Sequence, residues 1–295
     1  MSNSGECATT IRTPPGWGLE QLNHGLHLLG SKDPNEYWHE AGPTGGVPQA
    51  RRIGIADLKD ALSKGAADFG ACRTDVIFLC VIYPLLGLLM ARVAFGYQML
   101  PLLFPLASGF ALVGPFAAVG LNEMSRRREL ENDTTWVHAF GVLRSPAIGR
   151  ILVLGLVLMA TFLLWMGAAQ VIYDATLGPR APVSAAQFAH DVARTTAGWW
   201  MIGVGVGVGF LFAVFAMTIS VVSFPMLLDR NVSLETAVRT SIRAVTANPV
   251  TMAVWGLIVA AALVVGSIPA LLGLVIVMPI LGHATWHLYR HIVPS

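Results

Sequence analysis

The sequence has little charge. Asp, Glu, Lys and Arg make up only 12% of its 295 residues, whereas 55% of the residues are hydrophobic. Soluble domains carry about 25% charged residues, so this shortage indicates a membrane protein. The net charge of +2 is small and gives no reason to expect nucleic acid as a partner.

Cysteine is also scarce, with only three residues in the chain. Cys7, Cys72 and Cys80 have neither zinc-ligand nor thioredoxin spacing, so we expect no disulfide framework. The N-terminus lacks a positively charged start followed by an apolar core, and we therefore expect no signal peptide. Gly, Pro and polar residues dominate residues 1–52, which predicts a disordered cytoplasmic tail.

The sequence does contain long apolar runs. Six of them are close to the roughly 20 residues that a helix needs to cross a bilayer. The sequence thus predicts an all-α polytopic membrane domain over residues 53–293. Its six transmembrane helices are expected at 75–95, 99–121, 150–172, 200–227, 250–268 and 270–288, and Pro269 is expected to form a tight hairpin between the last two.

The distribution of positive charge predicts the orientation. Only Arg92, Arg180 and Arg194 fall on the side opposite the two termini, and the other Lys and Arg residues fall on the side of the termini and the 122–149 and 228–249 loops. Because Lys and Arg are retained in cytoplasmic loops, both termini should be cytoplasmic. We expect a multi-pass protein of the bacterial inner membrane, with the lipid bilayer as its surroundings.

An internal repeat is visible in the segments that precede alternate spans. "DLKDALSKGAADFGACRT" (57–74) aligns without a gap with "SLETAVRTSIRAVTANPV" (233–250). Apolar residues recur in both at helical spacing, with Asp57 and Ser233 at the N-cap position. "DTTWVHAFGVLRSP" (133–146) has a similar pattern. The predicted unit is one amphipathic inner-surface helix followed by a transmembrane hairpin, used three times.

Catalytic groups are missing from the predicted spans. No Asp, Glu, Lys or Arg lies near the middle of any span, which argues against a proton pump or an ion-coupled transporter. A nucleophile–base set and a carboxylate pair are absent there too. The protein is therefore not expected to be an enzyme.

His283 and His287 are the strongest candidates for a metal or cofactor site, and no bound cofactor is expected by default. An i, i+4 pair can bind zinc, but residues 284–286 supply no general base. A bis-histidine haem usually takes its ligands from two helices. Binding of haem or copper by this histidine pair remains one interpretation. The other interpretation is an interfacial belt, in which Trp286 and the histidines anchor the last helix among headgroups.

Two further groups have structural interpretations. Gly203, Gly205, Gly207 and Gly209 lie in "GVGVGVGF" and form small-xxx-small faces that favour close helix packing. The basic residues Arg126, Arg127, Arg128, Arg239 and Arg243 are interpreted as topology determinants or headgroup contacts. A partner-binding surface is the alternative for the first three of them.

Several phrases carry a resemblance to a known family: "ADLKDALSKGAADFGACRTDVIFLC", "LVGPFAAVGLNEMSRRRE", "FPMLLDRNVSLETAVRTSIRAVTANP" and "VMPILGHATWHLYRH". They resemble a bacterial domain-of-unknown-function family of predicted six-span integral membrane proteins, sometimes labelled cytochrome c oxidase subunit I. The resemblance covers about residues 53–293. It implies a membrane fold, and it supplies no functional residues.

The sequence favours a non-enzymatic scaffold or accessory factor that acts through lipid or protein contacts. One alternative is a passive conduit for a small apolar or lipid-like molecule. The other is a haem- or copper-binding protein associated with the respiratory chain. Other membrane proteins or respiratory-chain components are the partners that these hypotheses imply.

Overall fold

The structure is a computed structural model of the chain. It describes residues 48–80, 100–102, 105–106, 108, 114–116, 118–131, 141–143, 145–178, 182, 184–269 and 272–294. The predicted tail up to residue 47, residues 81–95 of the first expected span, much of the second and residues 133–140 of the middle amphipathic segment lie outside the described residues.

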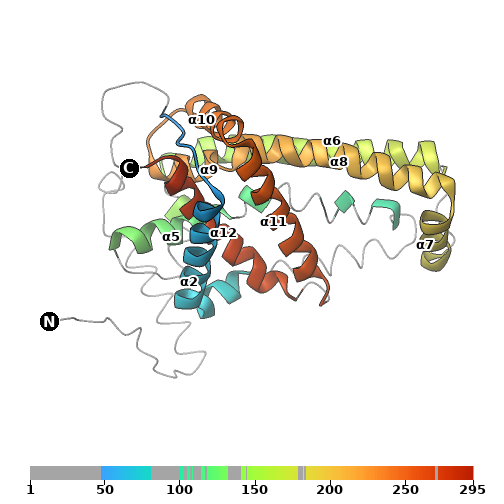
Figure 1. Cartoon of the computed structure of the whole chain (residues 1–295), viewed down its shortest axis with the longest axis horizontal. Coiled ribbons are helices and arrows are strands. Elements are labelled where there is room, and N and C mark those ends of the chain that lie inside the picture. Colours follow the sequence, from blue (N-terminus) through green and yellow to red (C-terminus); the bar gives the residue numbers. More distant parts are fainter. Residues whose placement is uncertain are drawn as a thin grey trace.

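The regular elements of the described part are helices. They are, in chain order, α2 (Ile55–Cys80), the short 3-10 helix η2 (Leu100–Leu102), α5 (Val119–Glu131), α6 (Ile148–Thr176), α7 (Ala185–Arg194), α8 (Thr196–Ser220), α9 (Ser223–Asp229), α10 (Leu234–Ala247), α11 (Pro249–Ser267) and α12 (Leu274–Ile292). Figure 1 shows α6 and α8 running side by side as a long arm with α7 at its far end. The remaining helices gather at the other end.

Three described helices are long and apolar enough to cross a membrane. They are α6, α8 continued into α9, and α11. The helix α12 is not among them, because its second half contains His283, His287, His291 and Arg290. Close packing of Gly266 on Gly273 brings the end of α11 against the start of α12, since a Cβ on Gly273 would lie 2.7 Å from the Gly266 carbonyl oxygen.

Two helix boundaries differ from the predictions. The charged stretch after the second expected span is helical, because α5 runs from Val119 to Glu131. The helix α2 begins at Ile55, before Asp57. Asp57 is therefore not its N-cap. Its carboxylate instead accepts a hydrogen bond from the Gly54 amide at 2.7 Å, which satisfies one of the free donors at the helix start.

Serine side chains cap the starts of α7 and α10, and the cap at Ser233 was predicted. Ser184 accepts from the Gln187 amide at 3.1 Å, and Ser233 accepts from the Thr236 amide at 3.1 Å. Both are the side-chain caps expected of a serine at this position. The start of each helix therefore follows from its own sequence.

The helices α2 and α10 bury matching faces. In α2 the buried face includes Ala61, Gly65 and Asp68, and in α10 it is formed by Ala237, Thr240, Ser241 and Ala244. In the gapless alignment Ala61 matches Ala237, Gly65 matches Ser241 and Asp68 matches Ala244. The side that faces the protein is thus made mainly of small residues, which let backbones approach closely.

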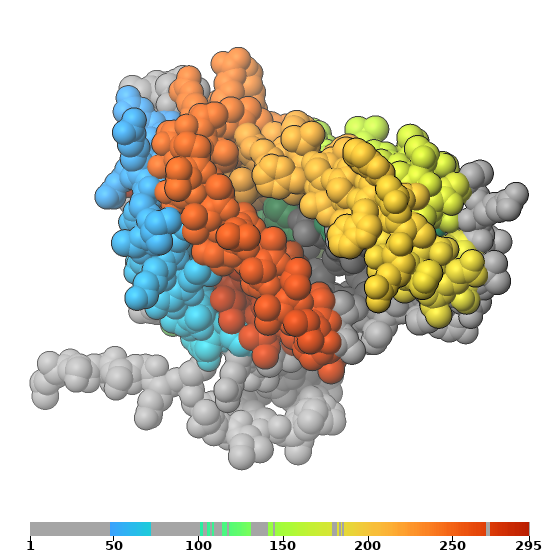
Figure 2. Space-filling view, turned by 45° about the vertical axis from the view of Figure 1, so that its right-hand side comes forward, coloured from blue at the N-terminus to red at the C-terminus, as the bar shows by residue number. Residues whose placement is uncertain are grey.

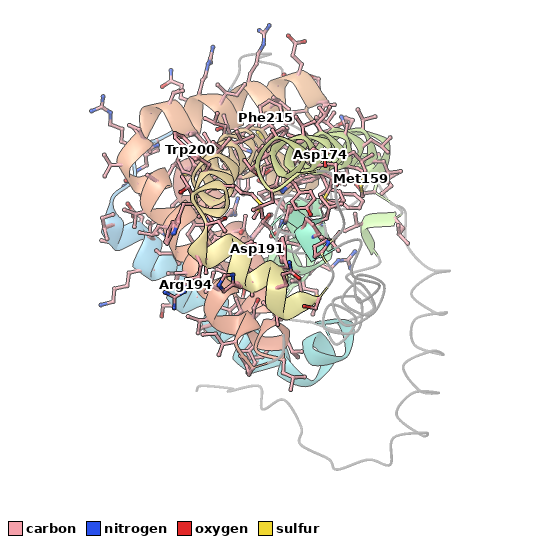
Figure 3. The ribbon with its side chains drawn as sticks, turned by 90° about the vertical axis from the view of Figure 1, so that its right-hand side faces the viewer. Met159, Asp174, Asp191, Arg194, Trp200 and Phe215 are labelled. Carbon is pink, nitrogen blue, oxygen red and sulfur yellow. The ribbon has the colours of Figure 1, made fainter. Side chains whose placement is uncertain are left out.

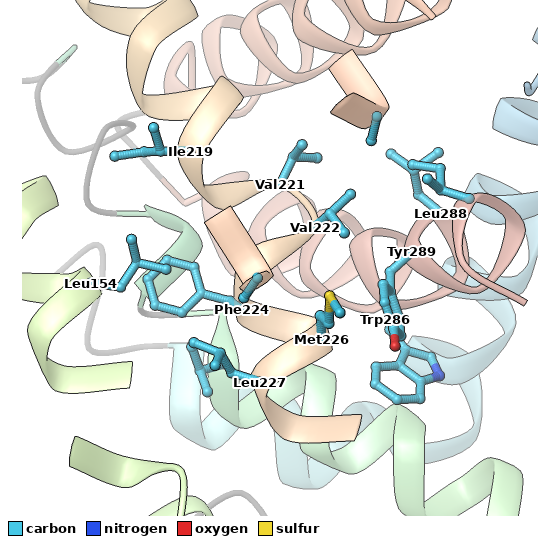
Figure 4. Packing of buried hydrophobic residues seen from close by; sticks show 14 of the residues in the cluster. Leu154, Ile219, Val221, Val222, Phe224, Met226, Leu227, Trp286, Leu288 and Tyr289 are labelled. Carbon is cyan, nitrogen blue, oxygen red and sulfur yellow. The ribbon is translucent and has the colours of Figure 1, made fainter. Parts of the chain in front are cut away.

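The apolar core lies where α6, α9 and α12 meet. Figure 4 shows Leu154 of α6 beside Phe224, with Met226 of α9 facing Trp286 and Tyr289 of α12. All five side chains are at most 2% exposed. Burial of this apolar surface holds helices from distant parts of the chain together.

Candidate functional site

A buried polar cluster joins α2, α5 and α12. It consists of Asp68 from α2, Ser125 and Arg128 from α5, and His283 and His287 from α12, and we call it the Asp68 cluster. The two histidines lie one turn apart on one face of α12. The helix α2 approaches them because Gly65 lies against the backbone of Ala284.

The Asp68 carboxylate is the centre of this cluster. Its Oδ2 accepts from Ser125 Oγ at 2.7 Å and lies 2.8 Å from His287 Nε2. Its Oδ1 accepts from Arg128 Nη1 at 2.8 Å. On its other side, Ser125 Oγ lies 2.7 Å from His283 Nδ1. Asp68, Ser125 and His283 are 8%, 1% and 1% exposed, so these three side chains are buried, whereas His287 and Arg128 at the edge of the cluster are partly exposed.

The surroundings of Asp68 favour its charged form. Burial raises the pKa of Asp68, but the hydrogen bonds with His287 and Ser125 outweigh this effect and leave the pKa below its ordinary value. The Arg128 guanidinium pairs with the same carboxylate. The cluster therefore holds an ion pair in which most hydrogen-bonding groups are satisfied, as a buried charge requires.

A second cluster lies beside the first and joins α5, α9 and α12. We call it the Asp229 cluster, and its members are Glu129, Asp229, Trp286, Tyr289 and Arg290. The Tyr289 hydroxyl donates to Asp229 at 2.6 Å, and Trp286 Nε1 donates to Glu129 at 3.0 Å. Arg290 pairs with Glu129 at 2.7 Å and lies over the Trp286 ring. These contacts fix the end of α12 against two other helices.

In the structure, one ring nitrogen of each of the two histidines is bonded within the Asp68 cluster. His283 Nδ1 is bonded to Ser125, and His287 Nε2 is bonded to Asp68. Among the described residues, no group of three or more His, Cys, Asp or Glu is arranged to hold a metal ion. Trp286 and Tyr289 are buried against α5 and α9, so they do not form the outward-facing belt that the sequence suggested.

The predicted basic residues divide into two groups. Arg126 and Arg127 both pair with Glu123, at 2.8 and 2.7 Å, and Arg128 pairs with Asp68. The first two pairs lie within α5, whereas the pair between Arg128 and Asp68 joins α5 to α2. On α10, by contrast, Arg239 and Arg243 are exposed. The pair between Arg239 and Glu235 at 2.6 Å is a solvent-exposed contact, which contributes little to stability.

The four glycines of α8 also differ in their surroundings. A Cβ on Gly209 would lie 3.0 Å from the Trp165 ring of α6, so this glycine packs inside the arm. A Cβ on Gly203, Gly205 or Gly207 would meet nothing within 4 Å. Figure 2 shows α8 on the surface of the molecule. Gly203 and Gly207, which are one turn apart and exposed, therefore lie on a side of α8 that the described part of the chain leaves open.

Sequence reasoning missed Asp68 and Ser125, although they are central to the cluster. The one available signal was Asp68 itself, a charged residue on the face of α2 that carries Ala61 and Gly65. Ser125 gave no signal, because a serine within "NEMSRRRE" is ordinary in a charged helix. The two residues are 57 positions apart, so only the tertiary fold brings them together.

Comparison with known proteins supports the membrane assignment. Residues 103–229 match the model of a family described as "Predicted integral membrane protein (DUF2189)". No curated protein and no solved structure matches the chain. The matched region contains two of the three apolar helices, α6 and α8. Family match and helix composition together make this chain a multi-pass integral membrane protein, similar over that region to a family of unknown function.

Proposed function

We propose that this protein is a non-enzymatic scaffold of the bacterial inner membrane, which binds other membrane proteins through the open side of α8. The observation that carries this proposal is the low burial of α8. Only 11% of its most apolar 18-residue window is buried, against 33% for α6 and 22% for α11. A span that makes so few contacts with the described part of the chain offers a side on which a partner helix can pack.

The glycines of α8 are the basis for expecting a helix as the partner. Gly203 and Gly207 are four residues apart and both are exposed. Small residues at this spacing let a second backbone approach closely, and such contacts drive helix association in membranes. Val204, Val206 and Phe210 are exposed around them and would add apolar contact area. Lipid chains at the exposed glycines would make fewer close packing contacts than a second helix would.

The two ends of the α8 arm support a fixed depth in the bilayer. At one end, Trp199 and Trp200 are exposed, and tryptophan is enriched at membrane interfaces. Figure 3 looks onto this end and shows Trp200 on α8 with the polar residues Asp191 and Arg194 on α7 nearby. At the other end, α10 carries the exposed Arg239 and Arg243, which are placed to contact anionic headgroups.

The same arrangement supports the topology that we propose, with six spans, three repeats and both termini in the cytoplasm. The basic α10 would lie on the cytoplasmic side and α7 on the opposite side. The matched small-residue faces of α2 and α10 support the repeat. The helices on which these two helices pack support it as well. α10 packs on α8 and α9, and α2 packs on α12. In this topology α2 and α10 would both lie at the inner surface. Each of them would pack against the end of the second helix of a transmembrane hairpin.

The proposal is tested by the size of the native complex. Membranes are solubilised in mild detergent, and the wild-type chain is compared by native gel electrophoresis with a Gly203→Ile, Gly207→Ile double variant. Gly167→Ile is the matched control. Gly167 is an exposed glycine of α6 at which an added Cβ would meet nothing within 4 Å, and it lacks a second glycine four residues away.

We expect the wild type and the Gly167→Ile variant to migrate in a complex that is larger than the single chain. The double variant should migrate as the single chain in its detergent micelle, while keeping the wild-type thermal stability. A wild-type protein that migrates alone would contradict the proposal. So would a complex that survives in the double variant.

A further inference from the structure

The segment that leads into α2 is held by residues from distant parts of the chain. The side-chain amide of Asn248, between α10 and α11, contacts it twice. Its Oδ1 accepts from the Ile53 amide at 2.8 Å, and its Nδ2 donates to the Arg51 carbonyl at 3.1 Å. Thr251 Oγ1 donates to the Ile53 carbonyl at 3.0 Å. The Arg51 amide donates to the Ile292 carbonyl of α12 at 2.8 Å.

These bonds fix a backbone and leave its arginine side chains outside. We call residues 51–53 the clasped segment. The backbone donors and acceptors of Arg51 and Ile53 are all bonded to residues outside the segment. Ile53 is buried, whereas Arg51 and Arg52 are exposed. Because the backbone is already fixed, these two side chains lose less conformational freedom when they bind a partner.

A third exposed arginine, Arg243, belongs to the same region. The Asn248 Nδ2 that bonds to Arg51 also donates to the Ala244 carbonyl at 2.9 Å. The clasped segment therefore passes beside the end of α10, as Figure 1 shows, and Arg243 directly precedes Ala244 in that helix. In the described part of the chain, no ion pair involves Arg51, Arg52 or Arg243.

The acidic residues of this region already have other partners. Glu235 of α10 pairs with Arg239 at 2.6 Å. The Asp57 carboxylate accepts from the Gly54 amide at 2.7 Å and lies 3.6 Å from His291. The described residues thus leave the charge of the three arginines without a counter-charge. An anionic partner is attracted to such a surface.

The apolar neighbours of the arginines favour the bilayer as this partner. The helix α11, which is long and apolar enough to cross a membrane, begins at Pro249, directly after Asn248. Exposed apolar side chains surround this point, since Val250, Ile55 and Ile242 are 72%, 54% and 39% exposed. The surface therefore changes from basic to apolar within a few residues, as expected where a protein passes from headgroups into hydrocarbon. A soluble acidic protein would leave these apolar side chains in water.

We propose that Arg51, Arg52 and Arg243 form a docking surface for the headgroup of an anionic phospholipid. Asn248 and Thr251 are positioning residues, because they hold the clasped segment beside α10. This proposal rests on the membrane-surface position of α10 in the proposed topology, and not on the open side of α8. Its failure would therefore leave the scaffold proposal to the native-gel experiment.

Native mass spectrometry of the full chain in mild detergent tests the docking surface. The probe is phosphatidylglycerol, and phosphatidylcholine with the same acyl chains is the matched control because its headgroup has no net charge. An Arg51→Gln, Arg52→Gln double variant removes two charges of the surface. A Lys64→Gln, Arg194→Gln double variant removes two charges from exposed residues of α2 and α7 and is the matched control variant.

We expect the wild type and the control variant to bind phosphatidylglycerol more tightly than phosphatidylcholine, with a difference that shrinks as salt is added. An arginine near an anionic surface contributes roughly fivefold in affinity, so the Arg51, Arg52 double variant should bind phosphatidylglycerol about 25-fold more weakly. Its affinity for phosphatidylcholine should not change. Equal affinities of the wild type for the two lipids would overturn the proposal and leave the surface to an acidic protein. An unchanged affinity in the double variant would overturn it as well.

The positioning role is tested by Thr251→Val, which keeps every charge and removes the bond to the Ile53 carbonyl. Trypsin should cut after Arg51 and Arg52 faster in this variant, and phosphatidylglycerol should bind more weakly. Thr246→Val is the matched control, because the Thr246 hydroxyl bonds within α10, and it should behave as the wild type. Faster cleavage with an unchanged lipid affinity would show that the clasp does not position the arginines. Unchanged cleavage would show that Thr251 does not hold the segment, which also contradicts the proposed role.

Discussion

The contact of α2 with α12 depends on Gly65, and a single methyl group there should destabilise the protein. A Cβ at Gly65 would lie 2.6 Å from the Ala284 nitrogen and 2.8 Å from its Cα and Cβ. Two of these three atoms belong to the backbone of a packed helix, which cannot rotate away. The two helices must therefore move apart when Gly65 is replaced by alanine.

The expected magnitude combines three effects. Overpacking of this kind costs about 1–3 kcal/mol. The separation of the helices also stretches the 2.8 Å contact between Asp68 and His287, and weakening a bond to a charged group costs about 1 kcal/mol more. Alanine regains about 1 kcal/mol over glycine in a helix. We expect a net loss of about 2 kcal/mol.

Thermal unfolding in mild detergent, followed by tryptophan fluorescence, measures this loss. For a chain of this size a loss of about 2 kcal/mol lowers Tm by about 4–8 °C. Gly70→Ala is the matched control, because Gly70 lies on the same helix and an added Cβ there would meet nothing within 4 Å. This control should raise Tm slightly through helix propensity. If both variants raised Tm equally, α2 would not pack on α12 at Gly65, and the reasoning would be refuted.

Three further predictions concern the two clusters. Tyr289→Phe removes the 2.6 Å bond to Asp229 and should cost about 1.5–3 kcal/mol in thermal unfolding; an unchanged Tm would show that water replaces the hydroxyl. Trp286→Phe keeps an aromatic ring but removes the donor to Glu129 at 3.0 Å, and its Tm should fall by more than that of a Trp200→Phe variant, whose ring is exposed. The pKa of Asp68 is lowered from 3.8 in the folded state, so its stabilising contribution is complete above the ordinary carboxyl range and is lost as pH falls through the lowered pKa. Acid unfolding of Asp68→Asn should therefore depend less on pH than that of the wild type, and equal slopes would contradict the assignment.

The sequence predicted those features that depend on neighbouring residues. Ser233 was identified as a cap because a cap involves only its own helix turn, and it makes the expected bond. The apolar runs of α6, α8 and α11 were recognisable for the same reason, since crossing a bilayer requires a continuous stretch of hydrophobic residues.

The candidate site was only half visible, because its parts are far apart in the chain. His283 and His287 attracted notice as an i, i+4 pair. Their partners Ser125 and Asp68 lie 158 and 219 positions away, and no local pattern links them. The run from Arg126 to Arg128 was interpreted through its positive charge alone. Glu123 and Asp68, which neutralise that charge inside the protein, could be identified only in the folded structure.

The central claim is that α8 offers its open side to another membrane protein, and photo-crosslinking in native membranes tests it most directly. A photo-reactive amino acid replaces Val206, which is exposed among the glycines of α8, and in a second protein it replaces Leu163, which is exposed on α6. The account predicts a discrete protein adduct from position 206 that disappears with Gly203→Ile, and lipid adducts alone from position 163. Lipid adducts alone from both positions would contradict it.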